Sequence, residues 1–240
     1  MEDTRVKKII VALTVSVLLA MWWHYRPHTI SAITTDTAYH YIVQNPKWGS
    51  DDTLPFIVAL HGNGDSMENF KKTLFRDLDI DTRIIFIQGP LNYRSGHAWP
   101  ISGAELKRYG DSLAEVVEQF SKKYPAAQKP ILVGFSGGGC MAYYQAAAHP
   151  DLYSTIIPIS GRLDPSFIRE TDLTDNAAMI VALHGTADKL IRYAAGADAV
   201  EHLAAMGREA QIIELTGGHL AVFTSGHDLF RKIVEESIMK

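Results

Sequence analysis

Residues 134–138 have the sequence GFSGG. They overlap the end of an apolar run that finishes at Phe135, and they precede a helical pattern that begins at Met141. A serine flanked by glycines between a strand and a helix is typical of a sharp turn beside a buried strand, where side chains would not fit. The hydroxyl of Ser136 would then project above the sheet and could attack an acyl carbon. The alternative interpretation is a glycine-rich turn that opens a helix or holds a phosphate.

A serine hydroxyl is a weak nucleophile until a base removes its proton, and histidine is the usual base. His219 follows the apolar run at residues 211–215 after a short turn that contains two glycines, so we expect it on a loop just after a strand. His227 begins the last helical pattern, where a capping or solvent-facing role is sufficient. We therefore predict that His219 is the base.

The base in turn needs an acid that fixes its tautomer and stabilises the imidazolium. Asp188 comes soon after the apolar run at residues 179–183, the strand that precedes the strand of His219. Asp164, which follows the strand before that, is the alternative acid. The order Ser136, Asp188, His219 along the chain matches one known order of a catalytic triad, and it favours Asp188.

The segment HGNGD at residues 61–65 closes an earlier apolar run. Its glycines let the backbone approach a substrate. We predict that the backbone amides of Asn63 and Gly137 bind the oxyanion that forms during acyl transfer. A phosphate cradle is the competing interpretation, but the G-K-[ST] signature is absent. The letters IVALHG occur at residues 57–62 and again at residues 180–185, which a shared way of ending a buried strand at a glycine turn explains.

No metal site is predicted, because the 10 histidines are scattered and H-E-x-x-H is absent. Cys140 is the single cysteine, so an internal disulfide is excluded. It lies one helical turn after Ser136, which favours a small buried side chain. A cysteine nucleophile is the alternative interpretation.

A set of strands and helices must position these residues. Short apolar runs bounded by Gly, Pro or polar residues predict strands buried on both faces, with helices between them. The alternation predicts an α/β fold, a mostly parallel central sheet with helices on both faces, as a single domain over residues 33–240. The predicted strands are residues 39–43, 55–60, 83–88, 130–135, 155–160, 179–183 and 211–215, and the clearest helices are residues 113–124, 141–148, 194–206 and 229–239.

The lengths of two intervals indicate how far the predicted active site is covered by other segments of the chain. The interval between Ser160 and Met179 is too short for a separate helical cap, so we expect no large cap domain and a fairly open site. Residues 88–108 are expected to be the longest irregular stretch. Within it, Trp99 either lines a pocket or packs the loop onto the body of the protein.

The chain has 240 residues, of which 47% are hydrophobic and 21% charged, which suits one domain and excludes wholesale disorder. Its net charge of −4 gives no basic excess for nucleic-acid binding.

The first 26 residues differ from the rest, because three basic residues precede an uncharged apolar run at residues 9–23. This pattern is typical of a cleavable signal peptide or an uncleaved signal anchor. Trp22 and Trp23 suit an anchor at the membrane interface, whereas residues 30–32 (ISA) are a weak cleavage site. Both interpretations predict a catalytic domain outside the cytoplasm, either anchored to the membrane through the uncleaved segment or exported to the periplasm or the medium.

Together with ISG at residues 159–161, HGTAD at 184–188 and GGH at 217–219, these motifs resemble the α/β-hydrolase superfamily. The closest resemblance is to the phospholipase/carboxylesterase group that includes acyl-protein thioesterases, from about residue 54 to the C-terminus. It implies a triad of Ser136, Asp188 and His219 and acyl transfer to water without a cofactor. Such thioesterases usually carry glutamine where this chain has Gly137. A resemblance to feruloyl esterases or polyester depolymerases, which share the same layout, is therefore an open alternative.

We therefore expect a serine hydrolase that cleaves carboxylic esters or thioesters, small-molecule or acylated, through an acyl-enzyme intermediate. One alternative is a serine peptidase of the same fold, although the large specificity domain of such peptidases is missing. The other is a non-catalytic protein of this fold that binds a ligand or partner. The sequence makes no prediction of the oligomeric state.

Overall fold

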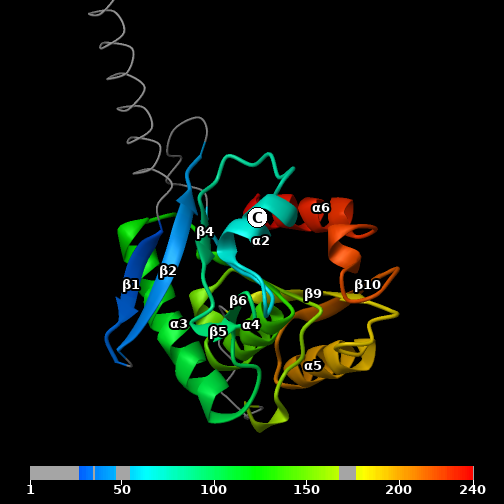
Figure 1. Cartoon of the computed structure of the whole chain (residues 1–240). Coiled ribbons are helices and arrows are strands. Elements are labelled where there is room, and N and C mark those ends of the chain that lie inside the picture. The colour runs from blue at the N-terminus through cyan, green and yellow to red at the C-terminus, as the bar shows by residue number, and fades with distance from the viewer. Residues whose placement is uncertain (1–26, 35, 47–54, 168–176, 240) are drawn as a thin grey trace, which may run out of the picture.

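The aliphatic runs of the sequence form one eight-stranded sheet in a computed structural model, which describes residues 27–34, 36–46, 55–167 and 177–239. Its strands are β1 (His28–Ala32), β2 (Thr37–Gln44), β3 (Ile57–Leu60), β4 (Ile84–Ile87), β7 (Ile131–Phe135), β8 (Thr155–Ile159), β9 (Met179–Gly185) and β10 (Ala210–Leu215). The strand order is β1-β2-β4-β3-β7-β8-β9-β10. Figure 1 shows β1 and β2 at one side of the molecule and β9 and β10 at the other. β2 is antiparallel to both of its neighbours, and every other neighbouring pair is parallel. The prediction of a mostly parallel sheet is confirmed.

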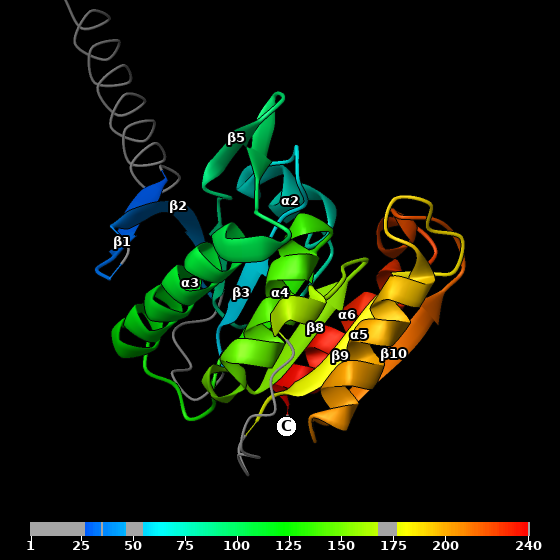
Figure 2. The same cartoon turned by 90° about the horizontal axis from the view of Figure 1, so that it is seen from below.

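Helices cover both faces of this sheet. They are α2 (Met67–Thr73), α3 (Gly103–Lys123), α4 (Gly137–Ala148), α5 (Tyr193–Ala205) and α6 (His227–Ile238), with short 3-10 turns η1 (Pro150–Leu152), η2 (Pro165–Phe167) and η3 (Ala221–Phe223). Figure 2 shows α3, α4 and α5 side by side over one face of the sheet. α2 and α6 pack on the other face. The described residues contain no separate cap domain, in agreement with the prediction.

Successive side chains of each central strand enter two different cores, as the two-residue period of a strand requires. In β3, Val58 and Leu60 pack with α3 and α4, whereas Ile57 and Ala59 pack with α2 and α6. Because both faces are buried, the strand is apolar throughout. The strands β4, β7, β8 and β9 are likewise buried along almost their whole length, which explains why their composition alone predicted them. The seven predicted strands correspond to β2, β3, β4 and β7 to β10, of which β2 and β10 are partly exposed.

Three elements differ from the sequence-based expectations. β1 pairs with β2, so the sheet begins at His28 and not after the expected domain start at residue 33. α3 begins at Gly103, well before the predicted residue 113. The sequence pattern did not indicate this first half of the helix, because it is polar and contains Gly110. A Cβ on Gly110 would lie 2.2 Å from the Tyr144 ring, so this glycine lets α3 approach α4. The short helix α2 was not predicted; the Ser66 side chain caps it by accepting a hydrogen bond from the Asn69 amide.

The stretch expected to be irregular contains a hairpin and the start of α3. Its strands are β5 (Leu91–Tyr93) and β6 (Gly96–Ala98). Trp99 follows β6 with 1% of its surface exposed and stacks on Tyr39, with ring centroids 6.2 Å apart. Of its two predicted roles, Trp99 therefore packs the loop onto the body.

The predicted signal or anchor segment, residues 1–26, lies outside the described residues and stays a prediction. Within the described ranges, no helix combines the length and apolar character that crossing a membrane requires.

Candidate active site

Ser136 occupies the turn between β7 and α4. Its backbone has φ 53° and ψ −110°, a conformation that a non-glycine residue adopts only at a cost of about 1–3 kcal/mol. The amide of Ser136 donates to the carbonyl of Ile159 at 2.8 Å, which ties the turn to β8. A Cβ on Gly134 would lie 2.1 Å from the carbonyl oxygen of Gly138, so the turn closes only with glycine there. Glycine is thus required at position 134 for the steric reason that the sequence indicated.

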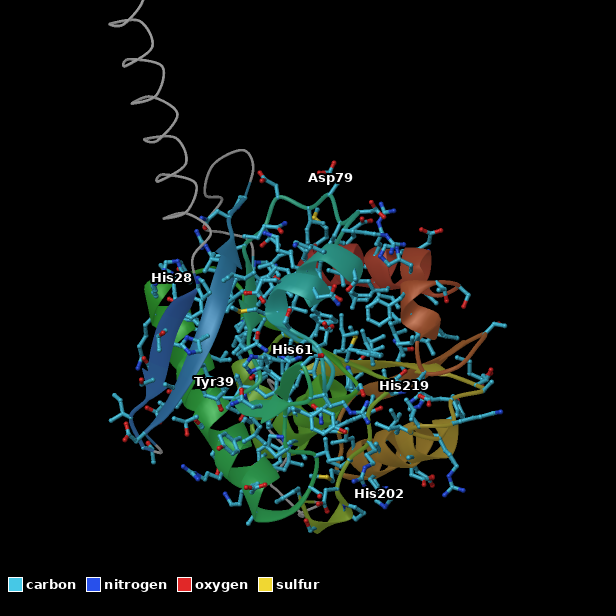
Figure 3. All side chains as sticks on the ribbon, in the orientation of Figure 1. His28, Tyr39, His61, Asp79, His202 and His219 are labelled. Carbon is cyan, nitrogen blue, oxygen red and sulfur yellow. The ribbon has the colours of Figure 1, made fainter. Side chains whose placement is uncertain are left out.

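His219 lies on the loop after β10 (Figure 3). Its Nε2 is 2.9 Å from Ser136 Oγ, and its Nδ1 is 2.7 Å from Asp188 Oδ2. Since a carboxylate only accepts hydrogen bonds, this pattern assigns the proton of neutral His219 to Nδ1 and leaves the Nε2 lone pair facing the serine hydroxyl. The structure therefore brings the three predicted triad residues into one hydrogen-bonded chain.

Asp188 follows β9 and has a fully buried side chain. Its Oδ1 accepts hydrogen bonds from the backbone amides of Leu190 and Ile191, at 2.8 and 3.0 Å. Its Oδ2 faces His219 and lies 3.4 Å from His184 Nε2. The carboxylate is thus held by the backbone of its own loop, and one oxygen is left to orient His219.

His184 is a residue of this site that sequence reasoning missed. Its ring is buried at the end of β9, and Nε2 donates to the carbonyl of Ile191 at 2.8 Å, across the loop that carries Asp188. His61 holds the equivalent place after β3, where Nδ1 donates to Gly62 O at 2.7 Å and Nε2 accepts from the Gly89 amide at 2.9 Å. The repeated IVALHG segment was the signal: in both copies the buried histidine bonds backbone groups of the loops at the strand ends.

The two predicted oxyanion donors lie beside Ser136. Gly137 is the first residue of α4, and Asn63 lies on the loop after β3. The amides of Gly64 and Asp65 are paired, with His97 O and Gly62 O. Among the described residues, no acceptor pairs with the amide of Asn63 or of Gly137. Both amides are therefore available to a ligand.

The alternative residues are engaged elsewhere. Asp164 accepts from the amide of Gly103 at 2.9 Å, and His227 Nε2 bonds the carbonyl of Leu74 at 3.0 Å. Burial within α4 raises the pKa of the Cys140 thiol to about 11, so it is not a thiolate near neutral pH. The described residues hold no cluster of three or more His, Cys, Asp or Glu side chains suited to a metal ion.

A cleft of about 520 Å³ opens onto Ser136 and His219. Side chains of α2 form a polar wall, and the loops after β9 and β10 form an apolar one. Leu190 and Leu220 stand at its mouth, 78% and 60% exposed. The lining residues are Gly62, Asn63, Gly64, Asp65, Asn69, Thr73, Arg76, Phe135, Ser136, Leu190, His219, Leu220 and Phe223.

A second cavity of about 530 Å³ lies at the amino ends of the central strands, beside Phe56 and Pro130, which precede β3 and β7. None of the residues Ser136, Asp188 and His219 lines this second cavity, so the cleft beside Ser136 is the candidate site.

Comparison with known proteins agrees with this geometry. The model of the phospholipase/carboxylesterase family matches residues 40–225. Mouse lysophospholipase-like protein 1 is 27% identical over 176 residues, which cover 63% of this chain and 73% of that protein.

Two solved structures show the same fold. Esterase PE8 superposes with a TM-score of 0.68 at 20% identity, covering 81% of this chain and 96% of its own. Acyl-protein thioesterase 2 of Zea mays superposes with a TM-score of 0.66 at 22% identity, covering 82% and 98%. The resemblance seen in the motifs is confirmed: the chain belongs to the phospholipase/carboxylesterase family of α/β hydrolases.

Proposed function

We propose that this protein hydrolyses carboxylic esters or thioesters through an acyl-enzyme on Ser136. The observation that carries the proposal is the chain of two hydrogen bonds, 2.9 Å from Ser136 to His219 and 2.7 Å from His219 to Asp188, at the floor of an open cleft. A serine so placed has a base to take its proton and an acid to stabilise the imidazolium.

In the first half of the proposed reaction, Ser136 Oγ attacks the carbonyl carbon and its proton passes to His219 Nε2. The amides of Asn63 and Gly137 hold the oxyanion. The tetrahedral intermediate collapses, and His219 gives the proton to the departing alcohol or thiol. In the second half, His219 takes a proton from water, which attacks the acyl-enzyme, and Ser136 leaves with that proton.

The test is hydrolysis of p-nitrophenyl esters from acetate to palmitate by the full chain and its Ser136→Ala variant, beside labelling with a fluorophosphonate probe. Turnover and labelling that both need Ser136 support the proposal. Labelling without ester turnover would favour a peptide or a particular thioester as substrate. Absence of both would favour the non-catalytic binding protein.

We also propose that residues 1–26 export the protein or anchor it to a membrane, with the catalytic domain outside the cytoplasm. The weak cleavage site at residues 30–32 lies in β1, where Ala32 is buried and paired with β2, so cleavage there would remove an edge strand. This favours the uncleaved anchor. N-terminal sequencing of the mature protein and fractionation of cells test it; a soluble protein that starts after Ala32 would contradict the anchor.

A further inference from the structure

The side chain of Asn63 is paired with the backbone of Trp99 through both of its polar atoms. Oδ1 accepts from the Trp99 amide at 2.8 Å, and Nδ2 donates to the Trp99 carbonyl at 3.0 Å. The next residues of the loop continue this pairing, because the Gly64 amide donates to His97 O at 2.7 Å and the His97 amide donates to Asp65 O at 2.9 Å. Residues 63–65 are therefore held against the β5–β6 hairpin by a short ladder.

This ladder determines where the Asn63 amide points. Gly62 and Gly64 flank Asn63, and Gly64 has φ 89°, so the loop backbone by itself is permissive. The neighbouring amides of Gly64 and Asp65 are used inside the protein, whereas the Asn63 amide is left for a ligand. The side-chain contact with Trp99 thus fixes the residue whose amide is the proposed oxyanion donor.

Gly137, the residue of the other proposed donor, leaves the space that the Asn63 side chain fills. A Cβ on Gly137 would lie 2.0 Å from Asn63 Oδ1 and 2.5 Å from its Cγ. The three atoms nearest to that Cβ all belong to the Asn63 side chain. Gly137 is not among the residues with positive φ, so space, and not backbone conformation, requires glycine.

We propose that Asn63 is a positioning residue that sets the oxyanion site through Trp99, and that Asn63 and Gly137 are a matched pair. A side chain at position 137 would expel the Asn63 amide group from Trp99. The proposal rests on the proposed function, since an oxyanion forms only if acyl transfer takes place.

A double-mutant cycle on the full chain tests the pair, with wild type, Asn63→Ala, Gly137→Ala and the double variant assayed on p-nitrophenyl acetate and by thermal unfolding. Each single variant should lose about 10- to 100-fold in kcat with KM changed less than about twofold, because a misplaced donor weakens only transition-state binding. The double variant should match Asn63→Ala within about threefold, since the second change then removes nothing further.

Thermal unfolding gives a readout independent of activity. Gly137→Ala alone should lower the melting temperature through the clash, and in the Asn63→Ala background the same change should not. If Gly137→Ala fails to fold while the double variant folds, the pairing is supported directly. Asn63→Asp, which places an oxygen against the Trp99 carbonyl, should also lower kcat and not KM. Asn92→Ala is the matched control, because Asn92 is exposed on β5 of the same hairpin.

Losses that multiply in the double variant, a melting-temperature loss equal in both backgrounds, or effects confined to KM would overturn the pairing. Full kcat in Asn63→Ala and Asn63→Asp would overturn the positioning role. Any of these results in an active wild type leaves the proposed function standing. A wild type that neither turns over esters nor labels with fluorophosphonate would overturn both proposals.

Discussion

The hydroxyl of Ser160 donates a hydrogen bond to the backbone carbonyl of His219 at 3.2 Å. Ser160 follows β8 with φ 46° and 1% of its surface exposed, so a buried, left-handed residue on one strand end contacts the loop that carries the proposed base. Its own amide donates to Leu183 O on β9 at 2.9 Å. The position of the His219 loop is therefore set by the ends of the neighbouring strands.

Ser160→Ala should lower kcat by about 3- to 10-fold and leave KM unchanged, because losing one neutral hydrogen bond of about 1 kcal/mol loosens the base and not the cleft. Steady-state kinetics on a p-nitrophenyl ester measure both constants. Ser154 precedes β8, and its hydroxyl also contacts a backbone carbonyl, that of Pro130, at 3.5 Å. Ser154→Ala is thus the control and should keep wild-type kcat. Equal kcat in both variants would show that the Ser160 contact does not position His219.

His184→Leu should reduce stability and kcat together. The change leaves the partly buried Ile191 carbonyl without its donor, which costs about 1 kcal/mol of unfolding free energy. The loop that holds Asp188 also loosens. Urea unfolding and ester kinetics measure the two effects. His202→Leu, on the exposed side of α5 (Figure 3), should change neither. A stable His184→Leu variant with full kcat would contradict the role assigned to His184.

Stability should fall as the pH drops from about 7 to 5, in part through His61. Burial lowers the pKa of His61 in the folded protein, whereas the unfolded chain has the ordinary value of about 6.5. Between these two pKa values the unfolded state binds one more proton. The stability that neutral His61 contributes is therefore complete above about pH 6.5 and lost as pH falls through the folded pKa.

His61→Gln should accordingly show a shallower fall in unfolding free energy over this pH range, whatever its stability at pH 7. One proton corresponds to at most about 1.4 kcal/mol per pH unit. Urea unfolding of wild type and His61→Gln at several pH values measures the slope. Parallel slopes in wild type and His61→Gln would refute this prediction.

The apolar wall of the cleft should set the preference for acyl chains. Leu220→Ser should lower kcat/KM for long p-nitrophenyl esters relative to the acetate, because each buried methylene contributes about 0.8 kcal/mol to binding. Leu220 is 60% exposed, so stability should change little. Met239→Ser, at another exposed apolar residue, is the control. An unchanged ratio of long to short esters in Leu220→Ser would place the acyl chain elsewhere.

Much of the fold could be predicted because its central strands are buried on both faces and are apolar throughout. β1 could not be predicted, because its sequence HTISA is short, largely exposed and next to the N-terminal segment. Only its pairing with β2 identifies it as a strand. The first half of α3 escaped because Gly110 is unfavourable in an isolated helix. Its close packing on Tyr144 is a tertiary contact, which local patterns do not contain.

The residues of the candidate triad were more predictable than the residues that hold their loops in place. Ser136, Asp188 and His219 follow strand ends in a recognisable order, and the structure brings them together. Ser160, His184 and the Asn63–Trp99 pairing escaped because each depends on which carbonyl or amide the fold places opposite a polar side chain. The repeated IVALHG segment is the one local sign, because both copies end in a buried histidine that bonds loop backbone.

Trapping the acyl-enzyme is the most direct test of acyl transfer through Ser136. The full chain is mixed with a p-nitrophenyl ester, quenched in acid during turnover, digested and examined by mass spectrometry, beside Ser136→Ala. The peptide containing Ser136 should gain the mass of the acyl group, and the variant should neither turn over the ester nor gain that mass. Turnover by Ser136→Ala, or an acyl group on a different residue, would contradict acyl transfer through Ser136.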